Sequence, residues 1–321
     1  MDLKQQIFYE FHKRDNFLII SHYSPDGDNI GSSLAIHRFL QTIGKNSIIV
    51  NEDPIPEKYK FLLLPTDRFY TFNDYNENSN FENIIALDCA TYDRLGKSTD
   101  LISEDHFIIN IDHHFTNPCY GNLNLIEHEK AATCQVIYDL LKINDFIINE
   151  KIGTPLYNGL VTDTGGFRFS NTTPEVLKIA SELSQLGVKP DFLMENAIYA
   201  NPAEEIKKIC SIISKLELYD DIKLVHLYHD DQAEPIKDND MVLSLLNSIN
   251  NVEVTLFTRK IESNLLKCSL RSSGYDVSNF ASQFGGGGHK QAAGLRFKGT
   301  IEDFRELVLK KLIGILENEN L

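Results

Sequence analysis

Cysteine is scarce in this chain, and its few copies follow no recognisable pattern. Five of the 321 residues are cysteine. They are odd in number, scattered, and include no CxxC pair: Cys89, Cys119, Cys134, Cys210 and Cys268. This spacing argues against a disulfide framework and against a zinc knuckle, and it predicts reduced thiols in a cytoplasm.

Long apolar segments and basic residues are also in short supply. No apolar run approaches transmembrane length, and residues 1–16 carry charges throughout with no apolar signal core. The chain has 31 lysines and arginines against 46 aspartates and glutamates, a formal net charge of −15. Proteins that track long nucleic acid usually carry a basic surface, so we expect no long duplex and no membrane as a partner. We predict a soluble, cytoplasmic protein with a small anionic substrate, which local metal charge can attract.

The composition is that of an ordinary globular protein, with strands and helices in alternation. A chain of this length predicts two domains, and 42% hydrophobic residues suffice for full cores. Continuous β-branched runs predict strands covered on both faces, at 16–21, 46–51, 83–88 and 106–111. Helical patterns lie at 29–43, 131–142, 150–162 and 172–187. We therefore predict an N-terminal doubly wound α/β domain with a mostly parallel sheet.

The character of the sequence changes after this first part. Prolines and cap-like residues around a short helix predict a linker over 188–215. Strand-like runs follow at 222–229, 251–259 and 265–271, with helical patterns at 278–284 and 301–316. We expect a smaller C-terminal α+β domain and a cleft between the two domains. The polar stretch 73–80 is expected to be an exposed loop.

Four short segments place carboxylates and imidazoles just after apolar runs. They are SHYSPDGDNIGS at 21–32, ALDCAT at 86–91, NIDHHFTN at 110–117 and LVTDTGGF at 160–167. Since the carboxyl ends of parallel strands meet at one edge of a sheet, where ligands usually bind, we expect these side chains to converge. Without partners the carboxylates would repel one another and be costly to desolvate, whereas divalent cations would offset that cost. The sequence therefore predicts a metal-dependent hydrolase.

Each of these residues has a simpler structural explanation when it is considered alone. The two aspartates of the first segment can cap the helix that follows, and Asp88 and Asp163 can cap a helix or a turn. Two adjacent histidines after a buried strand, His113 and His114, are harder to explain in this way. In combination, the carboxylate and imidazole ligands favour manganese, with iron, cobalt or magnesium as alternatives. There are more ligands than one ion needs, which indicates two ions.

Taken together, these motifs resemble those of the DHH phosphoesterase family. HYSPDGD, the lone Asp88 after a strand, DHH and TDTGGF are similar to the four motifs of that family. GGGGH at 285–289 is similar to the signature of the DHH-associated C-terminal domain. The resemblance covers nearly the whole chain and is strongest to the bacterial nano-RNase/pAp-phosphatase branch. It implies a DHH-type metal-binding catalytic domain over 1–187 and a substrate-binding DHH-associated domain over 216–321.

Carried over residue by residue, the resemblance implies a division of roles in the first domain. One metal would be held by three side chains: His22, Asp26 and Asp88. The other metal would be held by four side chains: Asp28, His113, Asp163 and Asp88. Asp88 would thus bridge the two metals. His114 would face the substrate phosphate, and Asp112 would orient the neighbouring histidines. The expected catalytic residues are thus Asp88, Asp112 and His114.

The second domain carries a possible anion clamp. Glycines let backbone N–H groups approach an anion closely, in what is called a nest. Arg271 ends a strand, and its guanidinium suits bidentate phosphate recognition. Considered alone, the glycine run is better explained as a flexible loop and Arg271 as a solvated surface charge. The resemblance implies these substrate-binding residues: His114, Arg271, Ser272, Gly286, Gly287, Gly288 and His289.

The resemblance also implies the reaction, in which a hydroxide shared by two Mn²⁺ ions attacks phosphorus in line. A closing cleft limits substrate length, so we expect 3′-phosphoadenosine 5′-phosphate (pAp), pApA, and RNA of about two to five nucleotides cleaved 3′ to 5′. An inorganic pyrophosphatase or exopolyphosphatase is the alternative enzyme, although the SRKKQ-like motif typical of family II pyrophosphatases is absent from the sequence. A non-catalytic nucleotide-binding sensor is an alternative of another class. The oligomeric state stays open, with a homodimer as one alternative.

Overall fold

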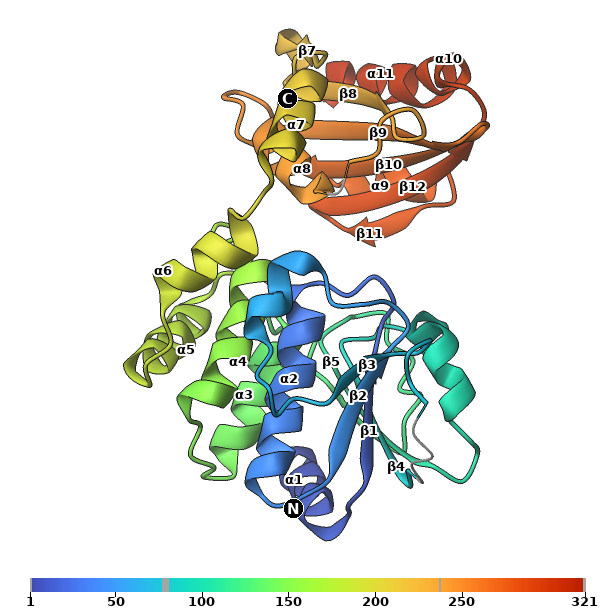
Figure 1. Cartoon of the computed structure of the whole chain (residues 1–321). Coiled ribbons are helices and arrows are strands. Elements are labelled where there is room, and N and C mark those ends of the chain that lie inside the picture. The colour runs from blue at the N-terminus through green and yellow to red at the C-terminus, as the bar shows by residue number, and fades with distance from the viewer. Residues whose placement is uncertain (1, 77–80, 237, 320–321) are drawn as a thin grey trace. The chain divides into compact units, whose positions relative to one another are not determined.

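The computed structural model describes residues 2–76, 81–236 and 238–319. Its chain divides into two compact units, Met1–Ala200 and Asn201–Leu321, which are described separately (Figure 1). The division falls inside the segment 188–215, whose role as a linker stays a prediction. In the expected loop, residues 77–80 lie outside the described part of the chain. No helix within the described residues has the length and apolar composition needed to cross a bilayer.

The first unit is built on six parallel strands in the order β3-β2-β1-β4-β5-β6. These strands are β1 (Phe17–Ser21), β2 (Ser47–Asn51), β3 (Phe69–Thr71), β4 (Asn83–Leu87), β5 (Phe107–Asp112) and β6 (Leu123–Ile126). The strand order reverses between β1 and β4, so the carboxyl ends of these two strands flank the switch point at which open α/β sheets bind ligands. The predicted doubly wound parallel sheet is confirmed.

Helices cover both faces of this sheet, which explains why its strands are continuously apolar. Phe17 and Ile19 of β1 are buried in the core beneath the α-helices, whereas Leu18 and Ile20 are buried with Leu95 of η2 on the other face. The helical elements of the unit are α1 (Leu3–Lys13), α2 (Gly27–Thr42), η1 (Glu57–Leu62), η2 (Tyr92–Leu101), α3 (Thr133–Ile143), α4 (Glu150–Asp163), α5 (Pro174–Gln185), α6 (Pro190–Leu193) and η3 (Met194–Ile198).

The prediction differs from the structure in several elements of the first unit. Helix α1 was not predicted. The short strands β3 and β6 were not predicted either, because most of their residues are only half-buried and neither strand carries a continuous apolar run. Helix α2 begins at Gly27 rather than near residue 29. A Cβ at Gly27 would lie 2.7 Å from the Cβ of Thr162, so the absence of a side chain lets α2 start directly against α4.

The second unit has a mixed sheet in the order β11-β12-β10-β9-β8-β7, in which only the β8–β9 pair is parallel. The strands are β7 (Glu217–Tyr219), β8 (Leu224–Asp230), β9 (Val254–Glu262), β10 (Leu265–Ser272), β11 (Gly287–His289) and β12 (Ala292–Lys298). The helical elements are α7 (Ala203–Ile213), η4 (Asp220–Ile222), α8 (Asn239–Asn247), α9 (Val277–Ser282), α10 (Ile301–Phe304), η5 (Arg305–Leu309) and α11 (Lys310–Glu319). The predicted smaller α+β domain is confirmed, although Ile209 and Ile212 of α7 are buried in its core, so part of the expected linker segment belongs to this unit.

Candidate metal centre

The four predicted segments converge at the carboxyl edge of the first sheet. His22 follows β1, Asp88 follows β4, His113 follows β5, and Asp163 ends α4. Three groups of side chains place one ligand atom each within 4.8 Å of the others: His22, Asp26 and Asp88; Asp28, His113 and Asp163; Asp88, His113 and His114. The structure therefore brings all the predicted metal ligands together, and their individual roles stay predictions.

On the β1 side, His22 points one ring nitrogen at two carboxylates. Its Nδ1 lies 2.7 Å from the carbonyl oxygen of Tyr23, so Nδ1–H donates to the backbone. Its Nε2 lies 3.5 Å from Asp88 Oδ2 and 3.7 Å from Asp26 Oδ2. Asp26 also caps α2, since its Oδ1 accepts from the N–H groups of residues 28 and 29. Capping, the simpler explanation, thus accounts for only one of the two Asp26 oxygens.

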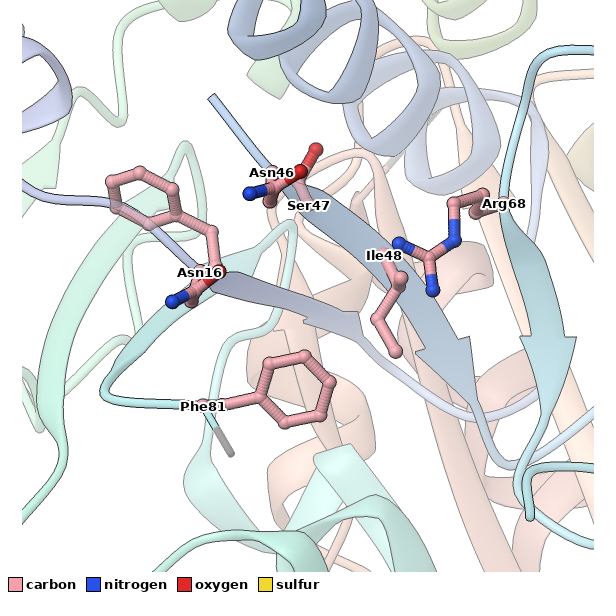
Figure 2. Close-up of a pocket in the computed structure, with 7 residues that line it drawn as sticks. Asn16, Asn46, Ser47, Ile48, Arg68 and Phe81 are labelled. Carbon is pink, nitrogen blue, oxygen red and sulfur yellow. The ribbon is translucent and has the colours of Figure 1, made fainter. Parts of the chain in front are cut away.

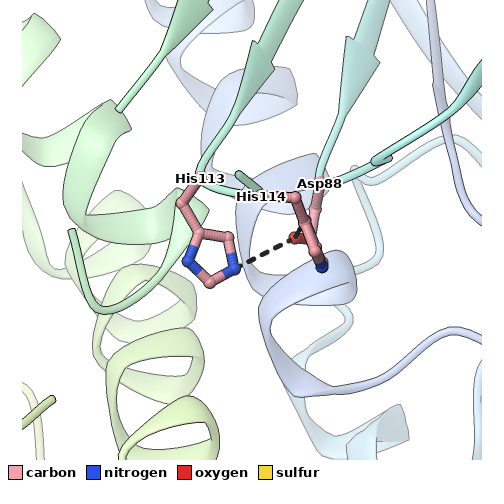
Figure 3. Close-up of side chains that lie close together, drawn as sticks. All are labelled: Asp88, His113 and His114. Carbon is pink, nitrogen blue, oxygen red and sulfur yellow. Dashed lines mark ion pairs between the residues drawn. The ribbon is translucent and has the colours of Figure 1, made fainter. Parts of the chain in front are cut away.

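On the β5 side, His113 repeats this arrangement. Its Nδ1 lies 3.2 Å from the carbonyl oxygen of Lys130. Its Nε2 lies 3.4 Å from Asp163 Oδ2 and 3.7 Å from Asp88 Oδ1; Figure 3 marks the contact with Asp88 by a dashed line from His113. Asp88 therefore presents one oxygen to each histidine and lies between the two groups.

These contacts fit metal ions better than they fit hydrogen bonds. A backbone carbonyl lies at Nδ1 of both His22 and His113, which leaves Nε2 as the ring nitrogen that faces the carboxylate oxygens. At 3.4–3.7 Å, these contacts between Nε2 and carboxylate oxygens are longer than ordinary hydrogen bonds. A cation between them would be coordinated from every side, by the oxygen and imidazole ligands that divalent transition metals accept.

Asp28 and Asp88 are the most deeply buried carboxylates of the cluster. Asp28 accepts hydrogen bonds from the N–H groups of Thr133 (2.6 Å) and Cys134 (2.9 Å) at the start of α3. Burial, and then the charge of Asp88, raise the pKa of Asp28 to about 7. Burial alone would raise the pKa of Asp88, but His22 and His113 outweigh it and hold this pKa low. Asp88 also has a φ of 51°, in the left-handed region that aspartate enters more readily than most other non-glycine residues.

His114 is oriented by Asp112 and also lies close to Asp88, whose Oδ1 is 3.7 Å from its Nδ1 (Figure 3). Its Nδ1 lies 2.7 Å from Asp112 Oδ1. Asp112 is fully buried, and its other oxygen accepts a 2.7 Å hydrogen bond from Asn117 Nδ2. Burial lowers the pKa of His114, but the hydrogen bond and charge of Asp112 outweigh this effect and raise the pKa to about 9. His114 therefore holds a proton at neutral pH, and its Nε2 is the ring nitrogen that remains for a ligand.

Two residues that hold this site were missed by the sequence analysis. The Thr133 hydroxyl donates to Asp88 Oδ1 over 3.1 Å, and Asn117 holds Asp112. Thr133 is the first residue of α3 and lies near the start of the helix predicted at 131–142, so its place near a helix start was the only signal for it. Asn117 lies in the quoted segment NIDHHFTN, but nothing in its spacing distinguishes it from a turn residue.

In the second unit, the predicted clamp residues meet on the sheet. Arg271 of β10 and His289 of β11 both pair with Ala292 of β12, so the three lie in one row and their side chains share a face. The Oγ of Ser272 accepts from the N–H groups of residues 274 and 275 and so shapes the turn after β10.

The glycine run is an edge strand in part, not only the nest or loop that the sequence suggested. Gly287 and Gly288 belong to β11, which pairs with β12. A Cβ would lie 2.6 Å from Leu295 Cβ at Gly286 and 2.6 Å from Ala293 Cα at Gly288, whereas at Gly287 it would meet nothing within 4 Å. Gly286 and Gly288 thus allow the strands to approach closely, and substrate binding by this segment stays a prediction.

A separate cavity lies at the opposite, amino edge of the first sheet (Figure 2). Its volume is about 320 Å³, and it is lined by Asn16, Phe17, Asn46, Ser47, Ile48, Arg68 and Phe81. None of the predicted ligands lines it. Because β1 and β2 begin here, this cavity lies away from the strand ends that carry the metal centre.

Comparison with known proteins agrees with this architecture. Residues 16–160 match the DHH family, N-terminal domain, and residues 221–318 match the DHHA1 domain. The bifunctional oligoribonuclease and PAP phosphatase NrnA of Thermus thermophilus is 36% identical over 283 residues, which cover 88% of this chain and 84% of that protein. The crystal structure of an exopolyphosphatase-related protein from Bacteroides fragilis is 25% identical with a TM-score of 0.84, covering 99% and 96% of the two chains. RecJ of Thermus thermophilus in complex with Mn²⁺ shares the fold at 13% identity and a TM-score of 0.54, over 98% of this chain and 55% of that one.

The fold, the clustered ligands and these matches define a class, the metal-dependent phosphoesterases. Within this class the chain belongs to the DHH family, with a DHHA1 domain in its second unit. The resemblance found from the sequence motifs, including that to the nano-RNase/pAp-phosphatase branch, is confirmed.

Proposed function

We propose that this chain hydrolyses short oligoribonucleotides and pAp at the switch point of its first unit, with two Mn²⁺ ions as cofactors. The observation that carries the proposal is the pair of ligand groups on either side of Asp88. The two activities are those named for the Thermus thermophilus relative. The acidic net charge of −15 also disfavours long nucleic acid and leaves short substrates.

The ligand atoms suggest which residues would hold each ion. His22, Asp26 and Asp88 would hold one, and Asp28, His113 and Asp163 would hold the other, with Asp88 shared. When bound, two such ions supply a nucleophilic hydroxide at neutral pH and neutralise charge on the phosphoryl group. Thr133 and the backbone carbonyls of residues 23 and 130 hold these ligands in place.

His114 would act on the phosphate from beside this centre. It is protonated at neutral pH because Asp112 raises its pKa to about 9, and Asp112 is in turn held by Asn117. A positively charged ring at this place would donate from Nε2 to a phosphoryl oxygen and stabilise the charge that develops there. As water adds to phosphorus, the bond to the nucleoside oxygen breaks, and that oxygen takes up a proton.

The second unit carries side chains that would bind a substrate phosphate. Arg271 and His289 share one face of the sheet through their common partner Ala292. A guanidinium and an imidazole on one face suit a phosphate, which accepts several hydrogen bonds.

An assay with a substrate panel tests the proposal. The purified chain with Mn²⁺ is given pAp, pApA, RNA of about two to five nucleotides, pyrophosphate and polyphosphate. We expect turnover of the nucleotides, and we expect Asp88→Asn to lower kcat/KM by about 10³-fold or more. Asp93→Asn is the matched control, because this exposed aspartate lies five residues further on and belongs to none of the ligand groups.

Two results would contradict the proposal. Full Mn²⁺-dependent activity of the Asp88→Asn variant would remove the shared ligand from the mechanism. Turnover of pyrophosphate or polyphosphate without turnover of any nucleotide would favour the alternative enzyme.

A further inference from the structure

Arg94 lies beside the metal centre and plays no part in the site as described so far. It belongs to η2, which follows the loop after Asp88. The N–H of Tyr23 donates to the carbonyl oxygen of Arg94 over 2.9 Å, and the N–H of Arg94 donates to that of Thr91 over 3.0 Å. The loop that follows His22 is therefore tied to the loop that follows Asp88, and Arg94 lies at their junction.

The Arg94 side chain is held by an aromatic ring instead of a carboxylate. Its guanidinium carbon lies 5.8 Å from the centre of the Tyr23 ring. Two other arginines of the unit are neutralised by acids, Arg14 by Glu10 and Arg38 by Asp67. Among the described residues, no acid does the same for Arg94. The charge of Arg94 thus remains available to an anion from outside, although the chain as a whole is rich in acids.

The charge of Arg94 also reaches the residue that would face the phosphate. Burial lowers and Asp112 raises the pKa of His114, and the charge of Arg94 adds a smaller lowering effect. Arg94 likewise lowers the pKa of Cys89, against the stronger effect of burial. The hydrogen bond from Tyr23, the residue after His22, and the position of Arg94 six residues after Asp88 place Arg94 at the edge of the sheet that carries the metal centre.

We propose that Arg94 binds a phosphate of the substrate from the first unit, and that Tyr23 is the positioning residue that holds its guanidinium. The inference deepens the proposed function and rests on it. A guanidinium presents a rigid fork of N–H donors that matches phosphate oxygens. The Tyr23 ring restricts the guanidinium before the substrate arrives, so less side-chain entropy is lost on binding. No internal ion pair has to break first, because no carboxylate holds the fork.

Variants of both residues test the inference. We expect Arg94→Ala to raise the KM for pAp and to weaken binding of its product AMP, each by about 10- to 100-fold, with Mn²⁺ affinity unchanged. Arg94→Lys should recover part of the loss, because an ammonium keeps the charge but not the fork. Tyr23→Phe should behave as the parent and Tyr23→Leu should not, since only the ring face is needed. The matched control is Lys97→Ala, an exposed cation of the same element, which should change neither value by more than about twofold.

The readouts separate this inference from the proposed function. AMP binding, measured by calorimetry with Mn²⁺ present, needs no turnover. If the parent chain binds AMP but does not hydrolyse pAp, the proposed function fails, and the Arg94→Ala variant still decides the role of Arg94. Parent-like KM and AMP affinity in Arg94→Ala would overturn the inference. A loss of Mn²⁺ affinity that matches the loss of AMP affinity would also overturn it, because Arg94 would then only support the fold.

Discussion

A single methyl group added at Gly159 should disable the metal centre without unfolding the protein. Gly159 lies in α4, where that helix crosses the start of α3 and the side chain of Asp28. A Cβ at this position would lie 2.8 Å from Cys134 Cβ, and closer still to Cys134 Sγ and Asp28 Oδ1. Real Cβ atoms essentially never come within 3.0 Å of such neighbours, so the carboxylate or the helix must move.

The size of both effects of Gly159→Ala, on stability and on activity, depends on which neighbouring groups move to relieve the clash. Overpacking costs about 1–3 kcal/mol, and replacing a helical glycine by alanine returns about 1 kcal/mol, so the unfolding free energy should fall by at most about 2 kcal/mol. Asp28 is held by the N–H groups of Thr133 and Cys134, so a shift of α3 moves its carboxylate too. A displacement on the order of 1 Å costs about 10²-fold in rate at a preorganised site. We expect Gly159→Ala to lower kcat/KM by about that factor and to weaken Mn²⁺ binding measured by calorimetry.

Two further variants identify the contact responsible. Gly159→Ala combined with Cys134→Ala removes the thiol from the clash but leaves Asp28, so metal binding should stay impaired. Gly314→Ala is the control for helix propensity, since a Cβ there meets nothing within 4 Å, and it should raise the unfolding free energy by about 0.5–1 kcal/mol. The reasoning is refuted if Gly159→Ala binds Mn²⁺ as the parent does and keeps full activity.

Three other perturbations have defined outcomes. Thr133→Val removes the hydroxyl that holds Asp88 and should weaken Mn²⁺ binding by about 10- to 100-fold, whereas Thr133→Ser should not. Arg271→Ala should raise the KM for pAp and leave Mn²⁺ binding unchanged; Lys298→Ala, an exposed cation of the neighbouring strand, should do neither. Burial lowers the pKa of His37 from 6.5 to about 4, so the unfolded chain binds the proton first and stability falls as the pH drops through this window. Between pH 6.5 and 4, the unfolding free energy of the parent should therefore fall by about 3 kcal/mol more than that of His37→Gln, as measured by urea titration. If the two proteins show the same pH profile, His37 is not the cause of the fall.

The parts of the first unit that the sequence predicted well are those set by burial on both faces. The strand at 83–87 is apolar from residue 84 onward because helical elements cover the sheet on both sides, so continuous apolar runs of this kind were enough to find the central strands. The same topology brings strand ends to one edge, and for that reason His22, Asp88 and His113 could be grouped without coordinates. Edge strands have no such signal, and β3 and β6 were missed.

The supporting contacts of the site could not be read from the sequence, because they depend on how distant segments meet. The bond from Thr133 to Asp88 joins residues 45 positions apart. The shared row of Arg271 and His289 depends on the register of two strand pairs, which spacing does not determine. Arg94 looked like any charged residue until the loop at Tyr23 was placed beside it.

The metal centre is expected to add stability as well as activity. Without a cation, the structure must keep Asp28 and Asp88 buried close together, which is why the pKa of Asp28 is raised to about 7, and it must hold Asp88 at a positive φ. A cation that binds this arrangement and not the unfolded chain adds about 2.7 kcal/mol at a concentration of 100 times its Kd. Thermal unfolding in Mn²⁺ and in a chelator should therefore differ by several degrees for the parent chain and by much less for Asp88→Asn. An equal shift in both proteins would mean that the cation acts elsewhere, and the link between the cluster and the fold would be lost.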